Sequence, residues 1–228
     1  MEEKSVAKLG GVCSVIVGIL YVLIGVTFIL VPAEQQGGIN DIAMFLPSFH
    51  QNPTAMTLLY VEFALGAILA IAAVPAITGL VRTVNEGWAR WTSNLAFLGF
   101  ALVAISYFQN IAIAQSQAAA FVAGDASTKA ALAVPTGVDP QFLLRYGTIG
   151  LWILVVSILA LKGKMLPTML SVVGILVAVL YWVLAVNDAF GVAMVVRPVL
   201  AIAGGVIAGP IWFMWIGIRL LKATSATS

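Results

Sequence analysis

Six long hydrophobic runs constrain this chain more than any other feature of its sequence. The runs cover approximately residues 10–31, 56–81, 91–113, 142–161, 166–187 and 198–218. Each run has about the 20 residues that a helix needs to cross roughly 30 Å of hydrocarbon. The sequence therefore predicts an all-α integral membrane protein, in which residues 1–228 form a single domain built as a bundle of six transmembrane helices.

Basic residues are concentrated on one side of this pattern. Eight of the eleven lie at the N-terminus, in the second and fourth connections, and at the C-terminus. These eight are Lys4, Lys8, Arg82, Arg90, Lys162, Lys164, Arg219 and Lys222. The four places share one face only if all six runs cross the bilayer. Because short loops rich in Lys and Arg stay in the cytoplasm, both termini are expected there.

The composition supports a membrane location. The chain is 62% hydrophobic and 9% charged, with a mean hydropathy of +1.09, whereas soluble domains are about 25% charged. The net charge of +2 comes from the eight basic residues named above, which we call the basic fringe, and gives no sign of nucleic-acid binding. The expected partners are the lipid bilayer and either other membrane proteins or a second copy of the chain.

The first and second outer connections are long enough to hold structure of their own. Residues 33–55 place Ile39, Ile42, Phe45 and Phe49 at near-helical spacing, with Pro47 as an interruption. This pattern predicts a short interfacial helix on the outer leaflet. The alanine-rich loop 116–140 is expected to be partly helical and to pack over the outer mouth of the bundle.

Small residues indicate which helix faces pack. Ala201, Gly205 and Gly209 recur at four-residue spacing, and Gly18 and Gly25 share a face of the first run. Such faces let helices approach closely in lipid, either within one bundle or between two copies. Within the bundle, we expect the last run to pack on the first run through Gly18 and Gly25. Trp152 falls near mid-depth, away from the interfacial belts, so it belongs either to the core or to a contact with another protein. We expect the helix over 142–161 to lie near such a contact.

Polar residues inside the runs gather at the outer level of the membrane. They form a candidate outer polar cluster of Glu62, Asn110, Arg145, Asp188 and Arg197. Ionisable groups at this depth are either structural ion pairs or a ligand site. We expect Glu62 to pair with Arg145 or Arg197, and Asp188 to pair with Arg197, since an unpaired buried charge is costly.

Several chemistries find no support in the sequence. Every lysine lies in a loop or at a terminus, and the single histidine, His50, lies in an outer loop. We expect no catalytic residue, no cofactor and no metal site, and hence no enzyme. We consider first a non-catalytic accessory or structural subunit of a membrane assembly, and second a small transporter or ligand-binding protein with an outward-facing polar pocket. An intramembrane enzyme comes last, because no nucleophile–base pair is visible.

Three apolar segments resemble a known family. They are Gly18-Ile19-Leu20-Tyr21, the segment Leu166-Pro167-Thr168 that continues to Leu176, and the closing stretch from Ile211 to Lys222. Together they look like the bacterial multi-pass membrane family named domain of unknown function 4386. The resemblance covers nearly the whole chain and implies a protein of the bacterial cytoplasmic membrane, without implying any catalytic residue.

Reporter fusions test the topology. A reporter that is active only in the cytoplasm should be active when fused after Lys222 and inactive when fused after Gly124, because these points lie on opposite sides of the predicted bundle. Activity at residue 124, or its absence at the C-terminus, would contradict the assignment.

Overall fold

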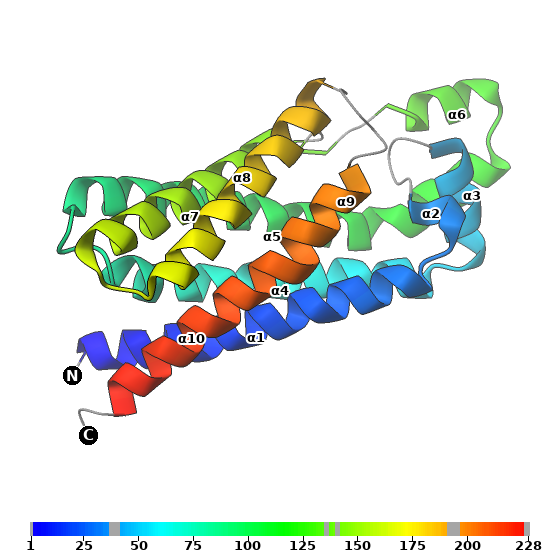
Figure 1. The fold of residues 1–228 in the computed structure, drawn as a ribbon. Coiled ribbons are helices and arrows are strands. Elements are labelled where there is room, and N and C mark those ends of the chain that lie inside the picture. Colours follow the sequence, from blue (N-terminus) through cyan, green and yellow to red (C-terminus); the bar gives the residue numbers. More distant parts are fainter. Residues whose placement is uncertain (1, 37–41, 135–136, 140–141, 191–196, 226–228) are drawn as a thin grey trace.

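The computed structural model describes residues 2–36, 42–134, 137–139, 142–190 and 197–225 (Figure 1). Within these residues, six helical spans are long and apolar enough to cross a membrane, as predicted. Five are α1 (Glu2–Leu30), α4 (Thr54–Gly79), α5 (Glu86–Ala123), α7 (Leu143–Gly163) and α8 (Thr168–Phe190). The last span joins α9 (Arg197–Ala201), the π-helix η2 (Ile202–Ala208) and α10 (Gly209–Ser225).

The six spans form a closed ring in chain order. Each span packs against the next one in sequence, and the last span packs against α1. Both chain ends lie at the same end of the bundle, which we call the terminal end (Figure 1); the opposite end is the distal end. Two tight turns also lie at the terminal end. One leads into α5, where the Asn85 side chain accepts from the Trp88 N–H at 3.1 Å, and the other contains Lys164 in a left-handed conformation.

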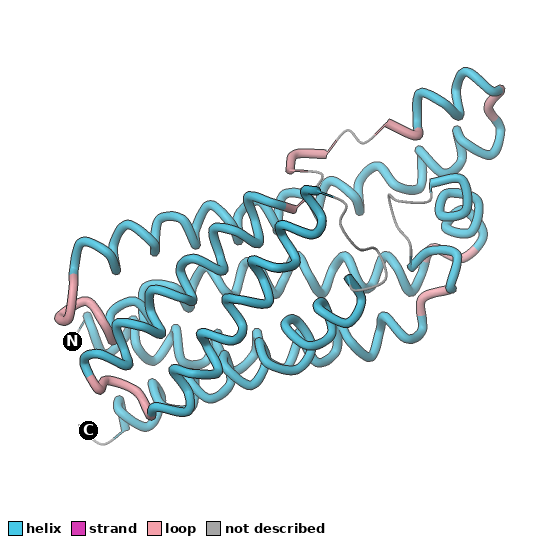
Figure 2. The backbone as a smooth tube through the Cα atoms, turned by 45° about the horizontal axis from the view of Figure 1, so that its top comes forward, coloured by secondary structure: helices cyan, strands magenta, loops and turns pink. Residues whose placement is uncertain are grey.

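A cap of short helices covers the distal end. At 38 residues, α5 is roughly 57 Å long, well beyond the ~30 Å hydrocarbon layer, so it does not stop near residue 113 as expected. Around its far end lie α2 (Ala33–Gln36), α3 (Ile42–Gln51) and α6 (Ala126–Leu132) (Figures 1 and 2). Asp125 begins α6 by accepting from the Thr128 N–H, and this bond lowers the pKa of the exposed Asp125 carboxyl. The prediction that loop 116–140 is partly helical is confirmed.

The helix α3, in the first outer connection, has different surroundings from those that the sequence predicted. A helix is present, but it runs through Pro47 instead of stopping there. Its apolar face does not lie on the outer leaflet: Phe45 and Phe49 are buried, stack at 5.6 Å, and belong to a helix that packs on α5. Ile39 lies outside the described residues. The extra turns of α5 offer these rings a protein surface, which the sequence pattern alone did not reveal.

Aromatic side chains fill the centre of the ring. Phe100, Trp152, Trp212 and Phe213 form a closed cycle of edge contacts with centroids 5.1–6.5 Å apart, which we call the central aromatic cluster. Trp152 is fully buried, and its indole N–H donates to the Thr78 hydroxyl at 3.0 Å. Of the two alternatives for Trp152, a core position and a contact with another protein, the structure therefore shows the core. The large exposed apolar side chains of α7 lie only near its two ends, at Leu143, Leu144 and Leu161.

The predicted close approach of the first and last spans is confirmed on the α1 side. A Cβ added at Gly18 would meet Met214 and the Pro210 carbonyl, and one added at Gly25 would meet Val206. The predicted stripe on the last span is wrong in part. Gly209 is buried, but Ala201 is exposed and Gly205 has no neighbour within contact distance.

The π-helix explains this difference. Its wider turn changes the rotation of residues 201–208 relative to α10, so Ala201 and Gly205 lie at a different angle to α1 than they would in a continuous α-helix. Gly204 instead packs on Leu180 and Tyr181 of α8. The α1 contact passes to Val206, Pro210, Met214 and Gly217.

Gly217 offers a test of this packing. A Cβ there would lie 2.7 Å from the Gly11 carbonyl oxygen and 2.9 Å from the Val15 nitrogen, and neither backbone atom can move aside. Gly217→Ala should therefore lower the melting temperature by about 5 °C. The sole cysteine, Cys13, is buried in α1, so the reaction of a thiol-specific dye with it reports unfolding.

Gly66→Ala is the matched control, because nothing lies within 4 Å of its added Cβ. It should melt at or slightly above the wild-type temperature, since alanine favours the helix. Equal melting of Gly217→Ala and wild type would contradict the close approach of α1 and α10.

Candidate functional site

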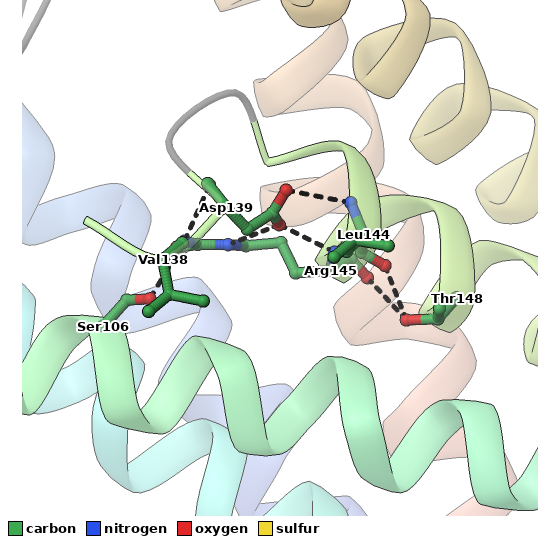
Figure 3. A network of polar contacts seen from close by, with 6 residues as sticks. All are labelled: Ser106, Val138, Asp139, Leu144, Arg145 and Thr148. Carbon is green, nitrogen blue, oxygen red and sulfur yellow. Dashed lines mark hydrogen bonds and ion pairs between the residues drawn. The ribbon is translucent and has the colours of Figure 1, made fainter. Parts of the chain in front are cut away.

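Arg145 and Asp139 form the central ion pair of the distal end (Figure 3). The Arg145 Nε lies 3.3 Å from Asp139 Oδ2, and both side chains are about 95% buried. The Arg145 Nη2 also donates to Ser106 Oγ at 2.9 Å and to the carbonyls of Val138 and Asp139 at 3.1 Å. The guanidinium lies over the Phe142 ring, 4.4 Å from its centroid. The arginine thus joins α5, α7 and the segment before α7.

Local chain geometry places Asp139 against the start of α7. Its carboxylate accepts from the backbone N–H groups of Leu144 and Arg145 at 3.0 and 2.9 Å. Both Asp139 and Phe142 have positive φ, which turns the chain sharply into the helix. A carboxylate at a helix N-terminus satisfies free N–H groups and complements the helix dipole. The same side chain therefore caps α7 and neutralises Arg145.

Glu62 lies elsewhere, between α1 and α4. Its Oε1 accepts a 2.9 Å hydrogen bond from the Thr27 hydroxyl, and the residue is only 8% exposed. Its Oε2 is buried with no hydrogen-bond partner within the described residues. The predicted pairing of Glu62 with Arg145 is wrong, because Arg145 takes the carboxylate six residues before it in the chain.

The remaining predicted cluster residues are separate from these two sites. Asn110 is half-buried on α5, and Asp188 is half-buried at the end of α8, where it accepts from the Asn187 amide at 3.4 Å. Arg197 begins α9, and its side chain lies outside the described residues, so its pairing with Glu62 or Asp188 stays a prediction. The described residues do not bring the five predicted positions into one pocket.

Sequence reasoning missed Asp139, Ser106 and Thr27. Asp139 carried a signal, since an acidic residue shortly before an apolar run is typical of a helix N-terminus. Ser106 and Thr27 carried none, because single hydroxyls inside apolar runs most often bond to their own helix. Among the described residues, no group of three or more His, Cys, Asp or Glu side chains could hold a metal ion.

Comparison with known families now adds to this geometry. Residues 16–223 match the family described as Domain of unknown function (DUF4386). The chain belongs to this family. The match begins within α1 and reaches α10, and the resemblance seen in the sequence is confirmed. No curated protein and no solved structure matches the chain.

The ion pair of this DUF4386 protein can be tested by a double-mutant cycle. Asp139→Asn and Arg145→Gln should each lower stability by about 3 kcal/mol, because each leaves a buried charge without its partner. The double variant should lose less stability than the two single variants lose together, and the difference should exceed about 1 kcal/mol. Thermal melting in detergent, followed by Cys13 reactivity, measures all four proteins.

The control cycle pairs Glu62→Gln with Arg145→Gln. These side chains do not touch, so their effects should add within about 0.5 kcal/mol. Strong coupling in this control, or additivity in the Asp139 cycle, would contradict the observed pairing.

Proposed function

We propose that this protein is a non-catalytic accessory or structural subunit of a membrane assembly. The central aromatic cluster is the observation that carries the proposal. Its four side chains are at most 1% exposed and occupy the axis of the ring. A carrier or channel binds its substrate along a polar route that reaches mid-depth, and here the axis is filled with aromatic rings.

The hydrogen bonds and the ion pair of Arg145 also support a structural role. Its donors go to Asp139, to the Val138 carbonyl and to Ser106, all within the protein. A substrate would have to displace these bonds to reach the guanidinium. We therefore assign this arginine to holding the segment before α7 against α5 and α7, and we propose no catalysis at this end.

Two exposed helix faces offer surfaces for a partner. On α8, Val172, Leu176, Val179, Val183 and Val186 are exposed and follow a four–three spacing. On α1, Ile16, Ile19, Leu23 and Val26 do the same. This spacing suits packing against a further helix as well as contact with lipid. With Trp152 in the core, α8 and α1 replace α7 as the helices where we expect a partner.

The proposal also includes the membrane in which the protein lies and the side on which its termini lie. We propose the bacterial cytoplasmic membrane, with both termini in the cytoplasm. The terminal end of the bundle carries the eight residues of the basic fringe, and exposed Trp88 and Trp91 lie beside them as an interfacial belt would.

One observation favours a second function. The buried Oε2 of Glu62 has no partner within the described residues, and an intramembrane carboxyl is a common ligand or proton site. The alternative is therefore a small transporter or ligand-binding protein that uses Glu62 and Thr27 between α1 and α4.

Photo-crosslinking in native membranes distinguishes these functions. A photoreactive residue at Leu176 or Ile19 should give protein adducts at one of the two faces, and the native mass in mild detergent should exceed that of the monomer. Val177, fully buried on α8, is the matched control and should give no intermolecular adduct. Lipid adducts alone, together with a monomeric mass, would contradict the subunit proposal. A small molecule that is bound to purified wild type and absent from purified Glu62→Gln would establish the alternative.

A further inference from the structure

A second kind of site lies at the terminal end of the bundle, between α10 and the turn that joins α7 to α8. The structure has a cavity of about 300 Å³ there. This end of the bundle carries both chain termini (Figures 1 and 2). It is lined by Leu80, Met165, Leu166, Arg219, Lys222 and Ala223. None of these residues belongs to the distal ion pair or to the central aromatic cluster.

The cavity has two cationic groups at its rim. Arg219 and Lys222 are three residues apart on α10, so their side chains lie on the same face of the helix. Both are exposed, and among the described residues the structure gives neither one a hydrogen bond or an ion pair. Among the described residues, no acidic side chain lines the cavity. Two positive charges with no anion beside them favour a negatively charged ligand.

The other lining residues are apolar. Leu80 and Leu166 are half-buried and buried, and Met165 is exposed at the end of the α7–α8 turn. Above Arg219 on the same helix, Ile218 and Ile211 are exposed along the membrane span. A ligand that meets both parts must carry an anion at one end and hydrocarbon at the other.

The neighbouring cavity provides a contrast. It measures about 450 Å³ and is lined by Lys4, Ser5, Lys8, Thr224 and Ser225. Every one of these residues is polar, whereas the cavity at Arg219 also has three large apolar side chains in its lining. Lys4, Thr224 and Ser225 also have interactions of their own.

We propose that the cavity at Arg219 and Lys222 binds the phosphate headgroup of an anionic phospholipid. The guanidinium suits a phosphate because it can donate two parallel hydrogen bonds, and Lys222 adds a second positive charge. The acyl chains lie along Met165 and the exposed face of α10. Basic pockets at helix ends bind lipid headgroups through this combination of charge and apolar surface. The site is independent of the proposed subunit function.

Native mass spectrometry of the detergent-purified full chain tests the site. The probe is an equal mixture of phosphatidylglycerol and phosphatidylcholine with the same acyl chains. Wild type should retain phosphatidylglycerol preferentially, and the double variant Arg219→Gln/Lys222→Gln should lose about tenfold or more of that preference. Met165→Gln should weaken retention of both lipids, because it removes part of the apolar wall.

The matched control is Arg90→Gln/Lys162→Gln. Like the test variant, it removes one arginine and one lysine near this end of the bundle, but it changes no residue that lines the cavity. Its lipid preference should equal that of wild type, and thiol-dye melting at Cys13 should show that all variants are folded. An equal loss of preference in this control would overturn the site, because net charge alone would then account for binding.

A second arm separates a lipid from free phosphate. Inorganic phosphate and chloride are added at equal ionic strength to the lipid-bound protein. If both salts displace phosphatidylglycerol equally, the effect is screening and the lipid site stands. If phosphate alone displaces it and raises the melting temperature of wild type but not of Arg219→Gln/Lys222→Gln, the cavity is a free-phosphate site and the lipid proposal is wrong.

Discussion

The space at the centre of a six-membered helix ring is the constraint on which the rest of this structure depends. When each helix packs mainly on its neighbours in sequence, side chains must fill the axis, because a void gives up dispersion contacts. Here four aromatic rings from α5, α7 and α10 close that space, and Thr78 satisfies the Trp152 N–H. The ring can then close only where α1 and the last span approach at backbone distance, through Gly11, Gly18 and Gly217.

The distal end follows a different physical rule. A charge in a low-dielectric region needs a partner, and the partner that costs least entropy is close in the chain. Asp139 is held by the backbone of α7 and so meets Arg145 at little further cost. Glu62 instead accepts a hydrogen bond from the neutral Thr27 hydroxyl. Arg145 and Glu62 thus lie at separate sites with different partners, although they share a depth.

Sequence reasoning predicted the spans well and the site poorly, for identifiable reasons. Hydrophobic length predicts a span because the bilayer thickness is fixed, and all six spans lie close to their predicted centres. The same reasoning ended α5 too early, since the turns beyond residue 113 lie in an alanine-rich stretch without a strong apolar signal. It also placed Glu62 with Arg145 because both share a depth. Depth is one coordinate, and contact also requires neighbouring helices.

By itself the sequence determined that six helices cross a bilayer, that basic residues gather at one end, and that α1 has a glycine face. These properties follow from local composition and spacing, which act along one helix at a time. Only the tertiary structure decided that Trp152 lies in the core, that η2 turns Ala201 and Gly205 away from α1, and that Asp139 holds Arg145. Each of these depends on the rotation of a helix about its own axis and on which neighbour it faces, and a sequence pattern does not specify either.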